Sequence, residues 1–287
     1  MMASGSDRAV TAIMKASAVP DSVVRCFVDR HDRIKLWFNM AFSQYYVAVM
    51  RSMQEARVTN IKPSELNYDK YAMDQYDRDI VNSIPFHKEL HTHIASFIEN
   101  NFDLTRALEV LDLGTGTGIT AKLVRDLLPL AHIDVVDFSE QMMSGAKKKL
   151  GDKNVGYIFG DYAHIDFQKK YDVVVSVIGI HHQNADGKRK LFNKIYSLLK
   201  SGGIFIFGDL VTYRDKYDAA RNNALHYHHL VERAFDETAL TEWAHHHMFL
   251  NDLAPVEDQI DWLSAAGFRV QKDYLRMNTC LIFASKD

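Results

Sequence analysis

Cysteine is scarce in this sequence, and the two that occur, Cys26 and Cys280, stand near opposite ends of the chain. They form no Cys-x-x-Cys pair, so the sequence supports neither a disulfide framework nor a cysteine-based zinc site. Such sparing use of cysteine fits a reducing compartment, and we expect a cytoplasmic protein.

Long apolar runs are missing as well. The longest uncharged run, 36–50, is shorter than the roughly 20 apolar residues that a membrane-spanning helix needs, and it contains Asn39, Ser43 and Gln44. The apolar stretch 9–14 is too short for the core of a secretory signal. We therefore expect no membrane segment.

An excess of basic charge is also absent, because 34 Lys and Arg stand against 37 Asp and Glu and give a net charge of −3. Proteins that hold nucleic acid through its phosphates usually carry a basic excess. The balance disfavours nucleic acid as a partner, although a local basic groove remains compatible with it.

The composition that is present is that of a folded globular protein. Apolar residues make up 47% and charged residues 25% of the 287 residues, which excludes collagen-like and largely disordered chains. This length allows one large domain or two small ones.

The N-terminal part of the chain is helical in pattern. Residues from about 21 to 56 lack glycine and proline, and the stretch 36–50 is apolar nearly all round, so a helix there must be covered. Two interpretations stay open: a buried core or homodimer contact, and a lid over a substrate. We predict an N-terminal helical extension over 1–65 and a second domain over 66–287.

From residue 106 onward, apolar strand patterns alternate with helical patterns. We predict strands over 107–113, 132–136, 155–159, 171–178 and 203–207, and helices over 118–128, 139–150 and 188–200. Such alternation predicts an α/β fold, a parallel sheet doubly wound with helices on both faces.

The C-terminal part has a different pattern. After a helix over 256–266, strands over 268–275 and 279–284 are joined by only three residues, which predicts a hairpin and an antiparallel last strand. An inserted helical stretch over about 213–253 precedes this part. The fold class is therefore a seven-stranded, mostly parallel sheet with N-terminal helices and a helical insertion before strand six.

A glycine-rich loop comes directly after the first predicted strand, in the segment VLDLGTGTG at 110–118, and opens a helix. Glycines let the backbone approach a ligand closely, and a helix N-terminus offers free N–H groups. Asp112 stands at the mouth of this loop, where a carboxylate repels a pyrophosphate but attracts an ammonium or sulfonium group. The loop therefore favours S-adenosylmethionine over NAD.

Two further carboxylates stand at the ends of strands two and three. Asp137 ends the second strand, 19 residues after Gly118, where a carboxylate can accept both hydroxyls of a ribose. Asp161 lies in the segment GDY at 160–162, where it can accept from an adenine amino group or simply form a turn.

Taken together, these segments resemble the class I S-adenosylmethionine-dependent methyltransferases, from about residue 68 to the end of the chain. Besides the loop, the resemblance lies in VDFSEQMM at 136–143, YDVVVSVIGIHH at 171–182, LLKSGG at 198–203 and AAGF at 265–268. It implies the doubly wound fold with an antiparallel seventh strand, S-adenosylmethionine as cofactor, and an enzyme that transfers its methyl group.

The resemblance also implies which residues bind the cofactor. Asp77, beside Tyr76 in a segment similar to the family's entry helix, would help to cover it. The implied cofactor-binding residues are Tyr76, Asp112, Gly114, Thr115, Gly116, Gly118, Asp137, Phe138, Met142, Asp161, Tyr162, Ser176 and Val177.

The segment after strand four narrows the choice of acceptor. The Asn/Asp-Pro-Pro-aromatic segment of enzymes that methylate base or amide nitrogens is replaced by IGIHH at 178–182, and neither cysteine stands where cytosine-5 enzymes need one. The segment SVIGIHH and the long insertion resemble the small-molecule branch. The alternatives are a tRNA- or rRNA-modifying methyltransferase, a carboxy-S-adenosylmethionine-type enzyme, and a non-catalytic partner subunit that binds cofactor.

Histidines are numerous, with 14 in the chain. A base assists methyl transfer to a hydroxyl, an amine or an acidic carbon, and His181, His182 and His247 are the predicted catalytic residues. We predict no metal, because adjacent histidines on a helix point in different directions. The three lysines at 147–149 are predicted to be solvated at a helix C-terminus.

Overall fold

The computed structural model describes residues 66, 68 and 73–287. The predictions for 1–65, including the homodimer contact and the lid, lie outside the described residues. The described residues divide into two compact units, one formed by those from 66 to 214 together with 252–287 and the other by 215–251. In the described part of the chain, no helix has the length and apolar character to cross a membrane.

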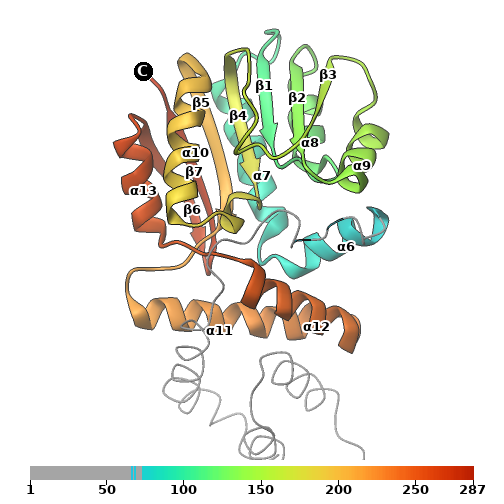
Figure 1. The fold of residues 1–287 in the computed structure, drawn as a ribbon, viewed down its shortest axis with the longest axis vertical. Helices are drawn as coiled ribbons and strands as arrows, with labels where there is room; N and C mark the ends of the chain where they lie inside the picture. Colours follow the sequence, from blue (N-terminus) through green and yellow to red (C-terminus); the bar gives the residue numbers. More distant parts are fainter. Residues whose placement is uncertain (1–65, 67, 69–72) are drawn as a thin grey trace, which may run out of the picture. The chain divides into compact units, whose positions relative to one another are not determined.

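A seven-stranded sheet forms the centre of the first unit (Figure 1). Its strands lie in the order β3-β2-β1-β4-β5-β7-β6, and β7 runs antiparallel to both β5 and β6 while the first five strands are parallel. The predicted fold class is thereby confirmed. The strands are β1 Glu109–Leu113, β2 His132–Asp137, β3 Val155–Phe159, β4 Tyr171–Val177, β5 Leu199–Leu210, β6 Arg269–Arg276 and β7 Thr279–Ser285.

Helices cover both faces of this sheet because the central strands are apolar on both sides. One face packs against α7 His87–Asn101, α8 Ile119–Leu127 and α9 Glu140–Leu150. The other face packs against α10 Ala185–Leu198 and α13 Val256–Ala265. A further helix, α6 Met73–Ser83, precedes α7.

Most element boundaries differ from the predicted ones by one or two residues, and two elements begin three or more residues earlier than predicted. Helix α10 begins at Ala185 rather than 188, because the side chain of Asn184 accepts a hydrogen bond from the N–H of Gly187 at 2.8 Å and caps the helix there. Strand β5 begins at Leu199 rather than 203, and the N–H of Gly202 donates to the carbonyl of Lys286 at 2.9 Å, which holds the predicted turn beside the end of the chain.

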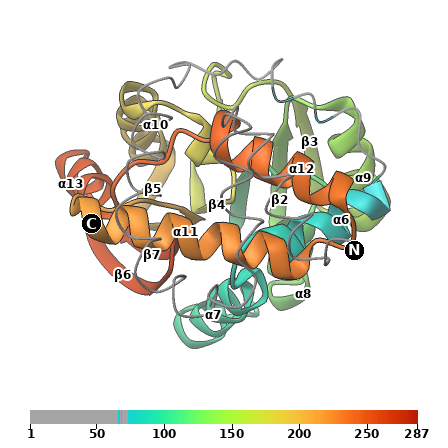
Figure 2. The same ribbon diagram turned by 90° about the horizontal axis from the view of Figure 1, so that it is seen from below.

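The described part of the second unit is helical. It consists of α11 Lys216–Arg233, α12 Glu237–His245 and a π-helical turn, His246–Leu250. Figure 2 shows α11 and α12 side by side, and buried residues that include Leu230 and Trp243 form a small core between them. The helical pattern predicted over 213–253 is present here, while the domain roles assigned to 1–65 and 66–287 stay predictions.

Candidate cofactor pocket

A pocket opens at the carboxyl ends of the parallel strands, the edge at which open α/β sheets bind ligands. It lies wholly within the unit that contains the sheet. The residues that line it are Leu66, Tyr68, Tyr76, Gly114, Gly116, Asp137, Phe138, Met142, Asp161, Tyr162, Ile178, Gly179, His182 and Gln183.

Nine of the predicted site residues line this pocket, and the others lie elsewhere. Asp112, Thr115, Gly118, Ser176, Val177 and His181 are not among the lining residues, although each belongs to the same unit. The pocket therefore brings together the ends of β1, β2, β3 and β4, as the predicted motifs require.

The glycine-rich loop is tied to the end of β2. The N–H groups of Gly114 and Thr115 both donate to the carbonyl of Val136 at 2.9 Å, and the N–H of Gly116 donates to Oδ2 of Asp137 at 2.8 Å. Gly114, Gly116 and Gly118 have φ values of 72°, 56° and 83°, a backbone region that residues other than glycine rarely adopt. The loop thus needs its glycines to reach the pocket.

Replacing Gly118 by alanine tests this requirement. The new Cβ would meet the Cα of Ala146 on α9 at 3.2 Å in addition to the positive φ. We expect the free energy of unfolding in urea to fall by about 1–2 kcal/mol or more. Gly202→Ala is the control, because Gly202 also has a positive φ, 73°, but nothing lies within 4 Å of its Cβ position. Equal losses in the two variants would show that the contact with α9 is unimportant.

Asp112 lies buried beneath the loop rather than at its mouth. It is 1% exposed, and its Oδ2 accepts a hydrogen bond from the hydroxyl of Thr115 at 2.7 Å. Burial raises the pKa of Asp112 to about 7, and the nearby carboxylate of Asp137 also raises it. The role of Asp112 toward a ligand stays a prediction.

The raised pKa of Asp112 predicts a pH dependence of stability. Between about pH 4 and pH 7 the folded protein holds a proton that the unfolded chain releases, so this group makes the free energy of unfolding fall as pH rises through that window. The slope is at most about 1.4 kcal/mol per pH unit. Urea unfolding of wild type and Asp112→Asn from pH 4 to pH 8 measures it: the wild type should lose stability relative to the variant, and parallel curves would contradict the assignment.

Asp137 lines the pocket at the end of β2. Besides accepting from Gly116, it accepts a hydrogen bond from the N–H of Ser139 through Oδ1 at 2.9 Å. Ser139 in turn caps α9 by accepting from the N–H of Met142 at 3.1 Å. This arrangement fixes a carboxylate, the ring of Phe138 and the side chain of Met142 around one corner of the pocket.

The turn after β3 supplies Asp161 and Tyr162. Asp161 accepts from the N–H of Ala163 at 2.9 Å and lies 2.8 Å from Nδ1 of His164. The hydroxyl of Tyr162 donates to the carbonyl of Gly179 at 3.1 Å, and burial raises the pKa of this tyrosine. The turn and the end of β4 are thereby linked across the pocket.

The end of β4 departs from ordinary backbone geometry. Ile178 has a φ of 55°, although a β-branched residue avoids that region, and its N–H donates to the carbonyl of Gly208 at 2.8 Å. The hydroxyl of Ser176 donates to the carbonyl of Leu113 at 2.8 Å. This strained position lies two residues before the helical turn η3, Ile180–His182, which carries the two histidines.

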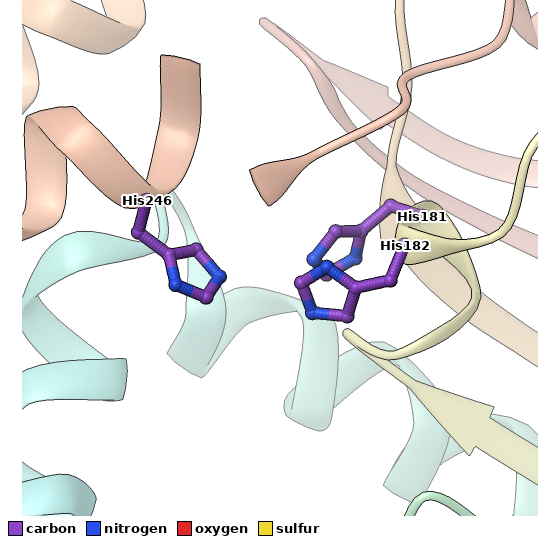
Figure 3. A group of neighbouring side chains, drawn as sticks. All are labelled: His181, His182 and His246. Atoms are coloured by element: carbon purple, nitrogen blue, oxygen red, sulfur yellow. The ribbon is translucent and has the colours of Figure 1, made fainter. Parts of the chain in front are cut away.

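His181 and His182 lie with their rings 4.0 Å apart between centroids (Figure 3). Asp209, near the end of β5, fixes the turn that carries them: it accepts from the N–H of His181 at 2.8 Å and lies 2.5 Å from Nδ1 of His181. Nε2 of His182 lies 2.9 Å from the hydroxyl of Tyr68, and both residues line the pocket.

Several residues at the site were not predicted from the sequence. Tyr68 lies between Tyr76, Phe138 and His182, with ring centroids 6.0–6.2 Å apart. Asp209 could have been noticed as a carboxylate at the carboxyl end of a parallel strand, where the other site residues also stand. No local motif marks Tyr68 or Gln183.

His247 belongs to the other unit. It is 3% exposed there, its Nε2 lies 2.8 Å from Oδ1 of Asn223, and its ring stacks on that of His226 with centroids 3.8 Å apart. His246, the third side chain drawn in Figure 3, is also part of this unit. A catalytic role for His247 stays a prediction.

Comparison with known proteins identifies the domain that carries the pocket. Residues 110–203 match the family described as "Methyltransferase domain". The chain is 27% identical over 217 residues to malonyl-acyl-carrier-protein O-methyltransferase 2 of Ilyobacter polytropus, covering 75% of this chain and 73% of that protein. It is 36% identical over 146 residues to a demethylmenaquinone methyltransferase of Leptospira interrogans, covering 49% of this chain and 57% of that protein.

Solved structures share the fold. An O-methyltransferase family protein from Burkholderia thailandensis matches with a TM-score of 0.58 and 17% identity, over 85% of this chain and 70% of that one. The CurJ carbon methyltransferase matches with a TM-score of 0.57 and 17% identity, over 88% of this chain and 68% of that one.

Fold and sequence match together define the class: the chain carries a methyltransferase domain, set in the seven-stranded fold of the class I methyltransferases. Within that class, residues 110–203 carry the match to the methyltransferase domain family. The predicted fold and enzyme class are confirmed.

Proposed function

We propose that the pocket binds S-adenosylmethionine and that the protein transfers its methyl group to a small molecule whose acceptor atom must lose a proton, such as a hydroxyl or an acidic carbon. One observation carries this proposal: Asp137, the glycine-rich loop and His182 all line the same cavity. A cofactor and a proton acceptor can therefore meet in one place.

The charges of the pocket support this cofactor. Among the described residues that line it, Asp137 and Asp161 are the charged side chains, and neither lysine nor arginine is present. Two carboxylates suit a ligand with an ammonium group, a sulfonium group and ribose hydroxyls. They suit a dinucleotide less well, because its pyrophosphate is anionic.

His182 would receive the proton of the acceptor. The nucleophile attacks the methyl carbon in line, the carbon–sulfur bond breaks toward sulfur, and S-adenosylhomocysteine leaves while the proton passes to the imidazole. The sulfonium already makes the methyl electrophilic, so the residues mainly position the reactants and remove this proton. Tyr68, at hydrogen-bond distance from Nε2, helps to orient the ring.

The presence of a base favours one kind of acceptor. A carboxylate is ionised at neutral pH and needs no base, whereas a phenol, a quinol or an acidic carbon gains from one. The names of the two relatives indicate one enzyme acting on malonyl-acyl-carrier protein at oxygen and another acting on demethylmenaquinone. The His182 environment favours an acceptor of the quinol type for this chain.

Transfer of a labelled methyl group tests the proposal. The protein is incubated with methyl-labelled S-adenosylmethionine and, separately, a hydroxylated quinol, a malonyl thioester and transfer RNA, and products are identified by mass spectrometry. We expect product with the quinol class. Label in RNA or only in the thioester would contradict the proposed acceptor, and cofactor binding without product from any acceptor would favour the non-catalytic subunit.

A further inference from the structure

Helix α6 is linked to the cofactor pocket through its residues 76 and 77. Tyr76 lines the pocket, and a Cβ placed on Gly116 would lie 3.8 Å from its ring. The next residue, Asp77, accepts a hydrogen bond from the hydroxyl of Thr117 in the glycine-rich loop and forms an ion pair with Nζ of Lys149. The contacts of Asp77 therefore bear directly on where Tyr76 lies.

Lys149, on α9, contacts both Asp77 and Thr117. It stands in the last turn of α9, and its Nζ donates to the hydroxyl of Thr117 at 2.9 Å as well as pairing with Asp77. The hydroxyl of Thr117 thus donates to one partner and accepts from the other, which uses both of its capacities. Asp77, Thr117 and Lys149, which we call the clasp, join α6, the glycine-rich loop and α9.

The burial of the clasp distinguishes it from an ordinary surface ion pair. The side chains of Asp77 and Lys149 are 30% and 28% exposed, and Thr117 is 2% exposed. Fully exposed pairs contribute little because water and salt screen them. A pair that is about two thirds buried and shares a buried hydroxyl is screened less.

The two neighbouring lysines show that this contact is specific to position 149. Lys147 and Lys148 are exposed, and Nζ of Lys147 lies 5.4 Å from the centroid of the Tyr157 ring on β3. The prediction that all three lysines are solvated is therefore wrong for Lys149. Its side chain reaches the glycine-rich loop because position 149 lies one turn after Ala146, on the side of α9 that packs against α8 and the sheet.

We propose that the clasp holds α6 against the glycine-rich loop, so that Tyr76 stays on the cofactor and the clasp sets how long the cofactor remains bound. This inference rests on the proposed function, because it takes S-adenosylmethionine and its product as the ligands of the pocket. Asp77, Thr117 and Lys149 act as positioning residues: they line up Tyr76 with the loop.

Dissociation of S-adenosylhomocysteine from the full chain, followed by stopped-flow, tests the clasp. In Lys149→Met we expect the dissociation rate to rise about fivefold. This factor corresponds to the removal of a partly buried ion pair that contributes about 1 kcal/mol. Lys148→Met is the matched control and should dissociate at the wild-type rate, and Lys149→Arg should restore most of the slow rate. Asp77→Asn combined with Lys149→Met should be no faster than the faster of the two single variants.

Salt and thermal stability separate positioning from general destabilisation. Sodium chloride should raise the rate at which S-adenosylhomocysteine dissociates from wild type toward the rate in Lys149→Met, and should leave the rate in Lys149→Met nearly unchanged. The midpoint of thermal unfolding of Lys149→Met should stay within about 2 °C of that of wild type. A wild-type rate in Lys149→Met, or an equal rise in Lys148→Met, would overturn the clasp. If wild type failed to bind S-adenosylhomocysteine, the proposed function would fall instead, and hydrogen exchange over 73–83 in Lys149→Met would still report whether the clasp holds α6.

Discussion

Replacing His182 by alanine is expected to lower turnover by about 10²–10⁴-fold, the range that a positioned general base contributes. The imidazole of His182 lines the pocket, and no other described histidine does so. The neighbouring His181 contacts Asp209 instead. Affinity for S-adenosylhomocysteine should change by less than about threefold. Steady-state kinetics with the identified acceptor and calorimetric titration of the product measure the two effects.

Two further variants sharpen this test. His132→Ala is a matched control, because His132 pairs with Asp134 at the opposite end of β2 from the pocket, and its turnover should be that of wild type. Asp209→Asn should lower turnover as well. Asp209 contacts the backbone N–H and Nδ1 of His181, and the amide of asparagine can keep only one of these two contacts, so the turn that carries His182 is held less firmly. Full turnover in His182→Ala would remove this residue from the mechanism.

Replacing Asp137 by alanine is expected to weaken binding of S-adenosylhomocysteine by about 100-fold or more. The carboxylate holds the N–H groups of Gly116 and Ser139, at 2.8 Å and 2.9 Å, and in the proposal it also accepts from the ribose. Hydrogen bonds to a charged group contribute about 1.5–3 kcal/mol each, and a loss of about 2.7 kcal/mol corresponds to 100-fold in affinity.

The amide variant provides the control for Asp137. Asp137→Asn keeps the shape of the side chain and one acceptor oxygen, so its affinity should fall between that of wild type and Asp137→Ala. Circular dichroism should show the same fold in all three proteins. Unchanged affinity in Asp137→Ala would place the ribose elsewhere and contradict the pocket assignment.

The sheet could be predicted from sequence because each strand is marked locally. The apolar runs of β1 and β4 are buried on both faces, and the short connection between β6 and β7 leaves no room for a crossover, so pairing can be deduced from pattern alone. The boundaries that shifted most, at the starts of α10 and β5, depend on a side-chain cap and on contact with the end of the chain, which pattern does not reveal.

The pocket could be predicted only in part. The residues at strand ends, such as Asp137 and Asp161, carry a positional signal because parallel strands end at one edge. Tyr68 and His182 are 114 residues apart, and His181 and Asp209 are 28 apart, so these contacts exist only after folding. The contact of Lys149 could not be predicted for the same reason: its partners stand on other elements.

Calorimetric titration of the purified protein with S-adenosylhomocysteine, and separately with NAD, tests the cofactor assignment most directly. We expect S-adenosylhomocysteine to bind at one site per chain, NAD not to bind, and Asp137→Ala to lose the binding. Binding of NAD without S-adenosylhomocysteine would show that the two carboxylates of the pocket do not select the cofactor as proposed, and would contradict the assignment.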